Sequence, residues 1–523
     1  MTLATNKQTP PLLAVYLWIF PGLVGGQSPW TDGFSSGFFK AAWPVVGGEV
    51  SNAIIDFFKT GRLLKQLNAT LLTLIPKRNY GVTHKPNTKC FVPGRLICDN
   101  VLLAQEFFSG YNQCRLPPRC ALKVDLRKAY DTVEWDFLIA TLRMFGFPAI
   151  FIRWIEECVT SAHYSVVVNG GVHGFFSGAR GLRQGDPMSP YLFVLVMEVL
   201  HMILQQLIEQ DGEFQYHWRC QELNLFQLSF ADDLLLLCKA DVRSVNLFRQ
   251  GLDRFATLSG LKTNPQKSQL IISKAVSGIR DALLATLGFQ EGQLPVRYLG
   301  LPLILARLSI TDCQPLLQKI DSRIKGWEGV QLSFAGRVQL IKSVLISFEV
   351  YWATAFILPK GIIKEMMKRL RTFLWKGTTA SGYPKVSWEA VCRPIEEGGL
   401  GIKDMLALNR ALMSKHLWAV IKQDRTSIWV DWIIQVRLRD CSIWTVKENK
   451  GAWGWRKMLS LRQSLMAHIH YRVGNGDSVS LWHDPWHPLG PLISRFPRGP
   501  QLTSTGLLDK LSMVIKDGQW NWP

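Results

Sequence analysis

Two short apolar runs separated by two acidic residues form the clearest local pattern in the chain. Residues 228–230 and 234–237 are almost entirely apolar and flank Ala231-Asp232-Asp233. Apolar runs of this length predict buried strands, and the short polar break predicts a hairpin with the aspartates in its tight turn. Upstream, residues 121–124 predict a further strand, which ends at Asp125.

Helical spacing of apolar residues predicts several helices around these strands. One helix follows Asp131, and Glu134 three residues later would complete a capping box with it. Another is predicted to start with Ser189 as its N-cap and Pro190 as its first residue. A third is predicted to end at Gly260. Strands and helices in this mixture predict an α+β fold.

The C-terminal half turns helical after Ser333 and later becomes rich in tryptophan. One helix carries the apolar stripe Ile363, Met367, Leu370 and Leu374. Lysines and arginines lie largely off that stripe, so they form either a nucleic-acid-binding face or a solvated surface. From about residue 383 the tryptophans predict core packing, with stacking on single-stranded bases as the alternative.

The paired acids of the hairpin have two interpretations. Carboxylates crowded at one turn repel each other, and a divalent cation would relieve that repulsion. Asp-Asp is also an ordinary turn dipeptide. Asp125 and the glycine-bearing loop at residues 180–190 favour the first interpretation. A strand-end acid, a glycine-bearing loop before a helix and an acidic hairpin follow one another in the palm of right-hand polymerases.

Charge and length narrow the class of protein. The 523 residues suffice for roughly three domains. The formal net charge of +20, with 60 Lys and Arg against 40 Asp and Glu, favours a polyanionic partner over an inert basic surface. The ten cysteines show no zinc-binding spacing. The apolar run at residues 12–24 is too short for a membrane span and has poor flanks for a signal peptide, so no membrane partner is expected.

Five motifs in order resemble one family. They are KVDLRKAYDTVEWDFL from Lys123, GLRQGDPMSPYLF from Gly181, SFADDLLLL from Ser229, SGLKTNPQKS from Ser259 and RYLGLPL from Arg297. Together they resemble the reverse transcriptases of non-LTR (LINE-type) retrotransposons, of the kind abundant in plants. The resemblance runs from about residue 33 to near the C-terminus and is weakest at both ends.

This resemblance implies a right-hand polymerase with a ferredoxin-like palm. It divides the chain into a non-family leader (residues 1–31), partial fingers (32–120), a palm (121–304), a thumb-like helical region (305–380) and a Trp-rich C-terminal region that we expect to be truncated (381–523). One finger segment of the family is missing between residues 77 and 90. Neither an endonuclease domain before the fingers nor an RNase H pattern after the thumb is recognisable.

The resemblance also implies the chemistry. Asp125, Asp232 and Asp233 would be catalytic and would bind two Mg²⁺ ions. The reaction would add dNTPs to a DNA primer on an RNA template. The family implies the nucleus, whereas the residues themselves indicate no compartment and no oligomeric state.

Five further residues match positions of the family that contact substrate. Arg95 would contact a nucleotide or template phosphate, or be a plain surface arginine. Tyr130 would lie under the sugar of the incoming nucleotide, or pack in the core. Gln184 and Gly185 would contact nucleotide and template, and Lys267 would neutralise or protonate the departing pyrophosphate, or simply be solvated.

Two other functions stay open at this point. The shortened fingers, the unusual leader and the missing endonuclease favour a catalytically dead retroelement remnant that at most binds nucleic acid. A maturase-like splicing factor is the third interpretation. The LINE-type motifs and the lack of an Arg-rich amphipathic start count against it.

Overall fold

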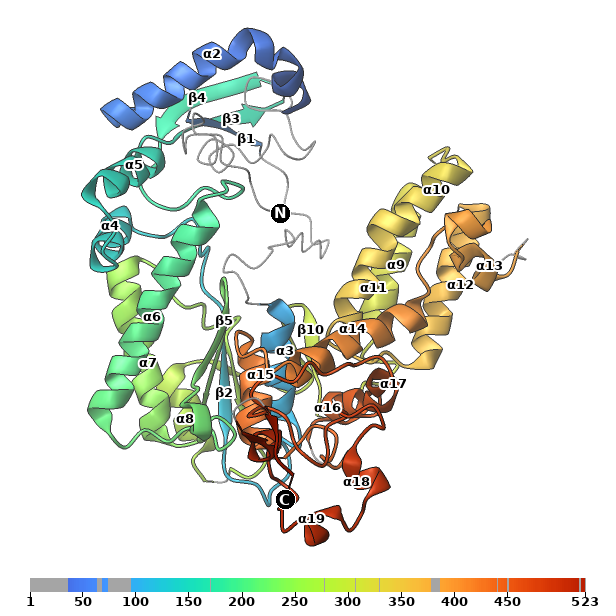
Figure 1. Cartoon of the computed structure of the whole chain (residues 1–523). Coiled ribbons are helices and arrows are strands. Elements are labelled where there is room, and N and C mark those ends of the chain that lie inside the picture. The colour runs from blue at the N-terminus through green and yellow to red at the C-terminus, as the bar shows by residue number, and fades with distance from the viewer. Residues whose placement is uncertain are drawn as a thin grey trace.

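A central sheet with one arm on either side organises the molecule, as Figure 1 shows. The computed structural model describes residues 36–63, 68–73, 96–169, 171–276, 278–305, 307–328, 330–377, 386–439, 441–448, 451–516 and 519–522. The first arm, called the N-terminal arm, is built from residues 36–73 and 149–177, and the other is a set of helices that follows the sheet in the chain. Helices and strands are mixed along the chain, as an α+β fold requires.

The central sheet has five strands in the order β5-β6-β2-β7-β8. The strands are β2 (Cys120–Val124), β5 (Gln227–Phe230), β6 (Asp233–Cys238), β7 (Gln269–Ile272) and β8 (Gln290–Glu291). The first four pair antiparallel and are connected as β-α-β-β-α-β, which is the ferredoxin-like arrangement. The strand before Asp125 and the acidic hairpin are therefore confirmed. Asp233 is the first residue of β6, so the turn itself is Ala231-Asp232.

Helices close in sequence to the strands cover one face of this sheet. They are α4 (Trp135–Met144), α6 (Ser189–Asp211), α7 (Val242–Ser259) and α8 (Arg280–Leu287). Leu122, Val124, Leu234 and Leu236 from the sheet join Phe193 and Phe248 in one hydrophobic core. Among the described residues α6 alone is long and apolar enough to cross a membrane by length and composition, and half of that stretch is buried inside the protein.

The start of α4 corrects the predicted capping box. The helix begins at Trp135, and Glu134 occupies the N-cap position without a capping hydrogen bond from its side chain. Both side chains of the predicted capping box instead bind residues that are distant in sequence. The Glu134 carboxylate pairs with Arg180 at 3.1 Å, and the Asp131 carboxylate accepts a hydrogen bond from Gln184 at 3.3 Å.

The other two predicted helix ends lie close to their expected positions. Met188 is the N-cap of α6, so Ser189 is its first residue, one position from the prediction. α7 ends at Gly260, which has a φ of 78°. A Cβ there would lie 2.5 Å from the Thr132 carbonyl oxygen, so both the conformation and the close approach require glycine.

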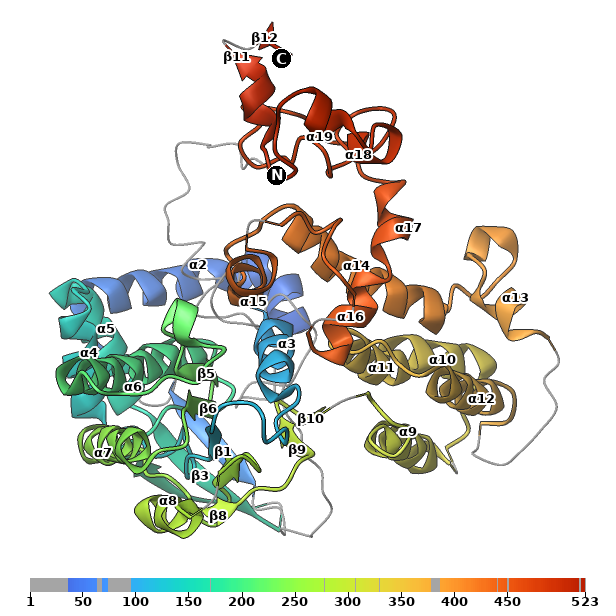
Figure 2. The same cartoon turned by 90° about the horizontal axis from the view of Figure 1, so that it is seen from below.

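Segments far apart in the sequence cover the second face of the sheet. α3 (Ile97–Phe108) lies against β5 and is backed by helices from the C-terminal region, an arrangement visible in Figure 2. These are α14 (Met405–Ile421), α15 (Ile428–Trp432), η5 (Ile433–Leu438), α16 (Trp453–Leu459) and α17 (Arg462–Met466). Leu235 and Leu237 of β6 share their core with Trp429, Trp432 and Trp455. Core packing is thus confirmed for these tryptophans.

A buried ion pair joins α3 to the C-terminal helices. Glu106 is 2% exposed, and its carboxylate lies 2.5 Å from the Arg437 guanidinium. The same carboxylate accepts hydrogen bonds from the Ala452 amide at 3.2 Å. Nearby, the Trp432 indole donates a hydrogen bond to the Arg219 carbonyl at 2.8 Å. Hydrogen bonds and an ion pair therefore stabilise the interface between α3 and the C-terminal helices, in addition to apolar packing.

The helical arm follows the sheet through a small hairpin of β9 (Val296–Tyr298) and β10 (Leu301–Leu303). Its helices are α9 (Gln314–Trp327), α10 (Phe334–Leu340), η3 (Ile341–Leu345), α11 (Ile346–Ala353), α12 (Lys360–Lys376), α13 (Trp388–Cys392) and η4 (Ile395–Glu397). Ile363, Leu370 and Leu374 of the predicted α12 stripe are buried, but Met366 is buried in place of Met367.

The N-terminal arm is a three-stranded sheet beside α2 (Ser36–Thr60) and α5 (Ala149–Thr160), as seen in Figure 1. Its strands are β1 (Ala69–Thr73), β3 (His163–Val168) and β4 (Gly171–Ser177), in the order β1-β3-β4. β1 pairs parallel with β3, and the Asn68 amide donates to the Cys158 carbonyl at 2.8 Å. This pairing joins segments about ninety residues apart.

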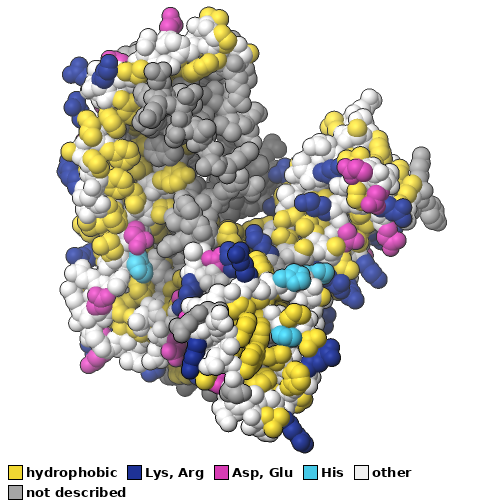
Figure 3. Space-filling model, viewed as in Figure 1, with side chains coloured by type: hydrophobic (Ala, Val, Ile, Leu, Met, Phe, Trp, Pro, Cys, Tyr) yellow, Lys and Arg dark blue, Asp and Glu magenta, His cyan; other side chains and the backbone are white. Residues whose placement is uncertain are grey.

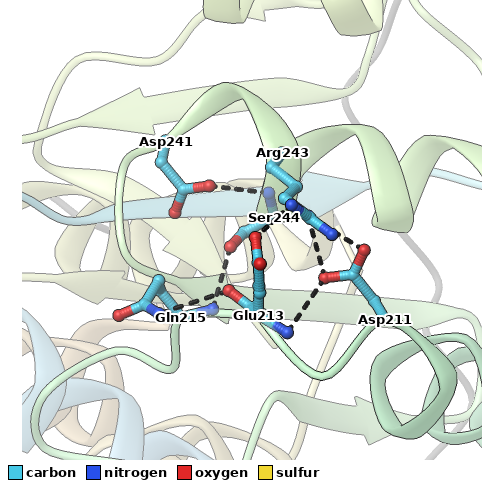
Figure 4. A network of polar contacts seen from close by, with 6 residues as sticks. All are labelled: Asp211, Glu213, Gln215, Asp241, Arg243 and Ser244. Carbon is cyan, nitrogen blue, oxygen red and sulfur yellow. Dashed lines mark hydrogen bonds and ion pairs between the residues drawn. The ribbon is translucent and has the colours of Figure 1, made fainter.

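A polar network joins the end of α6 to the start of α7, as Figure 4 shows. The Arg243 guanidinium lies 2.9 Å from the Asp211 carboxylate and also pairs with Glu213. Asp241 caps α7 by accepting the Ser244 amide hydrogen bond at 2.8 Å. The Ser244 hydroxyl in turn accepts from the Gln215 amide at 3.0 Å. These contacts connect two of the helices that cover the first face.

The last part of the chain forms a small unit with its own core. It contains α18 (Leu492–Arg495), α19 (Gly499–Leu502), η6 (Leu511–Val514), β11 (Ile515–Lys516) and β12 (Gln519–Trp520), and η2 (Gln221–Leu223) completes the elements. Leu481, Trp482 and Leu511 are buried together in this core. Trp418 on α14 and both Trp520 and Trp522 are about half exposed, so the prediction of core packing is wrong for these three.

Candidate active site

The register of the central sheet brings two of the predicted carboxylates together. Pairing of β2 with β6 ends at Val124 opposite Leu234. In the same register Asp125, which follows Val124, lies opposite Asp233, which precedes Leu234. Both aspartates therefore lie at the same end of these two central strands, which we call the sheet edge. Cα atoms of such opposed residues are about 4.5–5.5 Å apart. Asp232 occupies the adjoining turn and is exposed.

A turn from the SGLKTNPQKS motif fixes the backbone of Asp125. The Asn264 amide donates to the Asp125 carbonyl at 2.8 Å, and the Asp125 amide donates to the Ser268 hydroxyl at 3.0 Å. Lys267 is exposed in this turn, one residue before Ser268. The structure therefore places Lys267 beside the strand end that carries Asp125, while its amino group extends from the surface of the turn.

Tyr130 packs against the core and stays partly exposed. Its half-buried ring stacks on Phe193 of α6, with centroids 4.7 Å apart and planes 18° apart. Burial, and to a smaller extent the charge of Asp232, raise the pKa of Tyr130 to about 12. The hydroxyl is therefore protonated at neutral pH and lies within electrostatic reach of the acidic turn.

The glycine-bearing loop docks on the segment that follows Asp125. The Leu182 amide donates to the Tyr130 carbonyl at 2.6 Å, and the Trp135 indole donates to the Gly181 carbonyl at 2.8 Å. A Cβ on Gly181 would lie 2.7 Å from the Asp131 carbonyl oxygen, so the loop can approach this closely only with glycine. These bonds carry the following residues of the loop to the same end of the sheet.

Gln184 and Gly185 are both exposed in this loop. The Gln184 amide donates to the Asp131 carboxylate at 3.3 Å. Gly185 has a φ of 90°, and a Cβ there would meet nothing within 4 Å. The backbone at Gly185 is thus exposed, with open space beside its Cα.

Arg183 and Asp186 hold the loop in shape. The Asp186 carboxylate accepts from Arg183 at 2.8 Å and from the Met188 amide at 2.8 Å. Arg183 also donates to the Asn68 side chain at 3.0 Å, which connects the loop to the N-terminal arm. Asp186 therefore orders the loop, and its carboxylate is occupied by these partners.

Two residues outside the predicted site support the acidic hairpin from the second face of the sheet. The Asn100 amide of α3 donates to the Ser229 carbonyl at 2.9 Å. The Tyr298 hydroxyl donates to the Leu228 carbonyl at 3.4 Å. Burial and the nearby charge of Asp233 raise the pKa of Tyr298 well above its usual value. Both residues thus contact the strand that leads directly into the aspartates.

Sequence reasoning missed these supports because they act through backbone carbonyls. Tyr298 lies in the RYLGLPL motif, which was the only signal available for it. The motif forms a hairpin whose turn residues, Leu299 and Gly300, have φ values of 50° and 78°. The Tyr351 hydroxyl of α11 donates to the Leu299 carbonyl and so joins this hairpin to the helical arm.

The carboxylates suit a magnesium ion that arrives with its substrate. Within the described part of the chain, no three His, Cys, Asp or Glu side chains are gathered closely enough to hold a metal ion by themselves. Mg²⁺ prefers carboxylate oxygens, but it is usually bound by only one or two carboxylates together with water and substrate phosphates. Asp125, Asp232 and Asp233 provide donors of that kind at one edge.

Most of the predicted site is therefore gathered at one end of the sheet. The acidic turn, Asp125, Tyr130, the Gln184 loop and the Lys267 turn belong to elements that contact one another there. Arg95 lies outside the described residues. The arrangement offers carboxylates for a metal, an open backbone position for a ligand and the exposed cation Lys267.

Comparison with known proteins identifies a family. Residues 60–303 match the family described as "Reverse transcriptase (RNA-dependent DNA polymerase)". The Xenopus laevis transposon TX1 149 kDa protein is 24% identical over 422 residues, which is 72% of this chain and 30% of the relative. The Pol polyprotein of retrotransposable element R2 from Popillia japonica is 26% identical over 324 residues, covering 59% of this chain and 50% of the relative.

One further sequence relative and one solved structure are similar to parts of the chain. An Arabidopsis thaliana protein named for ribonuclease H is 34% identical over 203 residues, covering 37% of this chain and 32% of the relative. A solved telomerase from Candida tropicalis is 10% identical over 76% of this chain and 58% of that chain. The TM-score of this comparison is 0.33. The chain spans about a third to a half of the length of these sequence relatives. Residues 60–303 are therefore a reverse transcriptase domain, and it is similar to those of non-LTR, LINE-type retrotransposons.

Proposed function

We propose that this chain is an RNA-directed DNA polymerase that adds dNTPs to a DNA primer on an RNA template. The observation that carries the proposal is the register of β2 with β6, which sets Asp125 opposite Asp233 beside the Asp232 turn. Carboxylates at this edge of a ferredoxin-like sheet suit metal-assisted phosphoryl transfer, in which a protein contributes mainly positioning and charge.

We assign the regions of a right-hand polymerase accordingly. Residues 121–304 would be the palm, 32–120 the partial fingers and 305–380 the thumb, with the Trp-rich region at 381–523 behind the palm. In Figure 1 the sheet lies between the N-terminal arm and the helical arm, the arrangement that this assignment requires. A template and primer would then lie across the end of the sheet between the two arms.

Asp125, Asp232 and Asp233 would hold two Mg²⁺ ions. Bound there, the metal would lower the pKa of the primer 3′-hydroxyl and neutralise the charge that develops on the departing pyrophosphate. The chain positions these carboxylates through backbone bonds. Ser268 and Asn264 bind the Asp125 backbone, while Asn100 and Tyr298 support β5. Such fixed placement keeps the reorganisation cost small when the substrate binds.

The neighbouring residues would position the nucleotide. Tyr130 would place its ring under the sugar, where it would exclude a 2′-hydroxyl and select dNTPs. Stacking on Phe193 fixes the plane of that ring. Gln184 and the open backbone at Gly185 would contact nucleotide and template, and Lys267 would neutralise or protonate the pyrophosphate. We also propose Arg95 as a phosphate contact by its family motif alone.

Charge supports a nucleic-acid partner for the remaining surface. The formal net charge is +20. Figure 3 shows Lys and Arg side chains distributed over the face that includes both arms. A distributed basic surface gives salt-sensitive and largely sequence-independent affinity for phosphates, which suits an enzyme that accepts many template sequences.

Primer extension on a primed RNA template with Mg²⁺ and dNTPs tests the proposal. The purified chain should extend the primer, and the double variant Asp232→Ala, Asp233→Ala should not. Asp253→Ala provides a matched control, because Asp253 is an exposed aspartate of α7 whose carboxylate pairs with Arg249 of the same helix. This control should extend like the unchanged chain.

The alternative function is a polymerase fold without chemistry. If the unchanged chain fails to extend the primer but still binds RNA in a salt-sensitive way, the protein is a retroelement remnant that binds nucleic acid. Extension by the double variant would instead refute the assignment of the catalytic aspartates.

A further inference from the structure

Three tryptophans near the C-terminus line a cavity that the polymerase site does not use. The cavity has a volume of about 350 Å³ and is lined by Val473, Trp486, His487, Pro488, Trp520 and Trp522. Trp520 and Trp522 are 52% and 50% exposed, whereas Trp429 and Trp432 in the same Trp-rich region are almost completely buried. We call Trp486, Trp520 and Trp522 the tryptophan platform.

The rings of the tryptophan platform lie nearly parallel. Their centroids are separated by 5.5 Å between Trp486 and Trp520, 5.9 Å between Trp520 and Trp522 and 6.3 Å between Trp486 and Trp522. The planes differ by only 12° to 22°. Three nearly equal separations describe a triangle of offset rings rather than a three-ring column, so the rings form a stepped surface.

Hydrogen bonds fix the Trp486 ring and the backbone that carries the other two rings. The Trp486 indole donates to the Leu481 carbonyl at 2.9 Å. Trp520 pairs with Ile515 across the β11–β12 ladder, and the Asn521 amide donates to the Val514 carbonyl at 2.9 Å. The residue between Trp520 and Trp522 is thereby fixed. Because the rings are already ordered in the free protein, binding a ligand would lose little side-chain entropy, which favours affinity.

The geometry discriminates between ligand classes. Aromatic sites for alkylammonium cations surround the charge with rings, whereas parallel rings offer their faces to another flat ring. The six residues that line the cavity include no carboxylate to attract a cation. Exposed Arg472 precedes Val473, whereas Asp484 lies two residues before Trp486, so the charges nearest to the cavity in sequence have both signs. Flat, partly exposed rings on a chain with a formal net charge of +20 match a nucleic acid.

We propose that the tryptophan platform binds unpaired bases of single-stranded RNA by stacking. The proposal deepens the proposed function, on which its choice of RNA rests. Figures 1 and 2 place α18, α19 and the β11–β12 hairpin away from the β5–β6 hairpin. The platform would thus engage a single-stranded segment of the RNA outside the template and primer duplex at the sheet edge.

Binding of a labelled, unstructured oligouridine to the full chain tests the platform. The double variant Trp520→Ala, Trp522→Ala should bind ~10- to 100-fold more weakly, because each base stacked on an aromatic side chain contributes measurably to affinity. Trp418→Ala is the matched control, since Trp418 is 46% exposed on α14 and does not line the cavity. Its affinity should equal that of the unchanged chain.

Salt dependence separates stacking from charge. Removing a phosphate contact lowers the slope of log affinity against log salt, whereas removing a stacked ring does not. The double variant should therefore show weaker binding with an unchanged slope. Trp520→Phe, Trp522→Phe should recover most of the affinity, which excludes misfolding as the cause of the loss.

Three results would overturn the proposal. They are equal affinity of the alanine variant and the unchanged chain, a loss accompanied by a lower salt slope, and binding of a proline-rich peptide in place of oligouridine at the cavity. The test is independent of catalysis. Failed primer extension with intact platform binding would reject only the proposed function, and normal extension with no effect of the alanine variant would reject only the platform.

Discussion

The two faces of the central sheet are covered by different parts of the chain. α4, α6, α7 and α8, which lie close to the strands in sequence, cover one face. α3 and helices from beyond residue 305 cover the other. The two faces teach different lessons, because the first follows from local patterns whereas the second depends on pairing distant segments. Residues from both faces contact the strands that carry the carboxylates. A variant on either face can therefore be tested for its effect on the rate of primer extension and on the free energy of unfolding.

Loss of a carboxylate at the edge should have the largest effect. Asp125→Asn keeps the shape of the side chain but removes its charge, so primer extension should fall by ~10³-fold or more, as when a group needed in the transition state is lost. The melting temperature should change little, because Asp125 is only half-buried. Steady-state extension rates and calorimetry on the same preparation check both statements. Extension near the normal rate would contradict the assignment.

Breaking the buried ion pair of the second face should have the largest effect on stability. Glu106→Ala leaves Arg437 without its buried partner and should lower the free energy of unfolding by ~3–5 kcal/mol. Urea titration followed by tryptophan fluorescence measures this. If α3 and the C-terminal helices were independent units, the variant would unfold in two steps. A single, shifted transition would show that the second face is one cooperative unit.

The buried Glu349 of α11 predicts a pH dependence that belongs to the helical arm. Burial raises the pKa of Glu349 from 4.5 to about 8. Between these values the unfolded chain loses this proton while the folded chain keeps it, so stability is greatest below pH 4.5 and falls as the pH rises toward 8. Glu349→Gln should remove a decrease of a few kcal/mol. Thermal melts from pH 5 to pH 9 should therefore show a flatter profile for the variant.

A smaller change should separate positioning from stability. Asn100→Ala removes the hydrogen bond to Ser229 and should cost about 1 kcal/mol of stability. Because that bond supports the strand leading into the aspartates, the rate of extension should fall about tenfold or more. A loss of stability with an unchanged rate would mean that the second face does not position the carboxylates.

The counterpart on the first face should show the smallest effect. Arg243 is exposed in the network of Figure 4, and exposed ion pairs contribute little. Arg243→Ala should therefore produce a barely measurable change in melting temperature and none in extension rate. A clear loss of activity would show that the angle between α6 and α7 is transmitted to the sheet edge.

The sequence predicted the features that follow from local pattern. The strand before Asp125, the acidic hairpin and the end of α7 at Gly260 each depend on short-range periodicity or on a residue with a special backbone conformation. The capping box failed because Arg180 and Gln184, distant in sequence, take the side chains of Glu134 and Asp131. Local pattern contains no information about such partners.

The tryptophans illustrate the same limit. Composition alone assigned Trp429 and Trp520 to one region and one role, yet the first is buried and the second is half exposed. Asn100 likewise supports the hairpin through a backbone carbonyl that any residue would provide. Which side chain reaches which surface depends on how the second face closes, and that requires the structure.

The core of the second face also has a consequence for synthesis of the protein. It joins Val101 and Phe107 to Met458 and Leu459. Ribosomes add about 5–20 residues per second, so the apolar side of α3 would await its partners for roughly 20 to 70 s after it is made. During that interval the nascent chain exposes the hydrophobic surface of α3. Chaperone demand in cells should therefore depend on translation speed across residues 110–460.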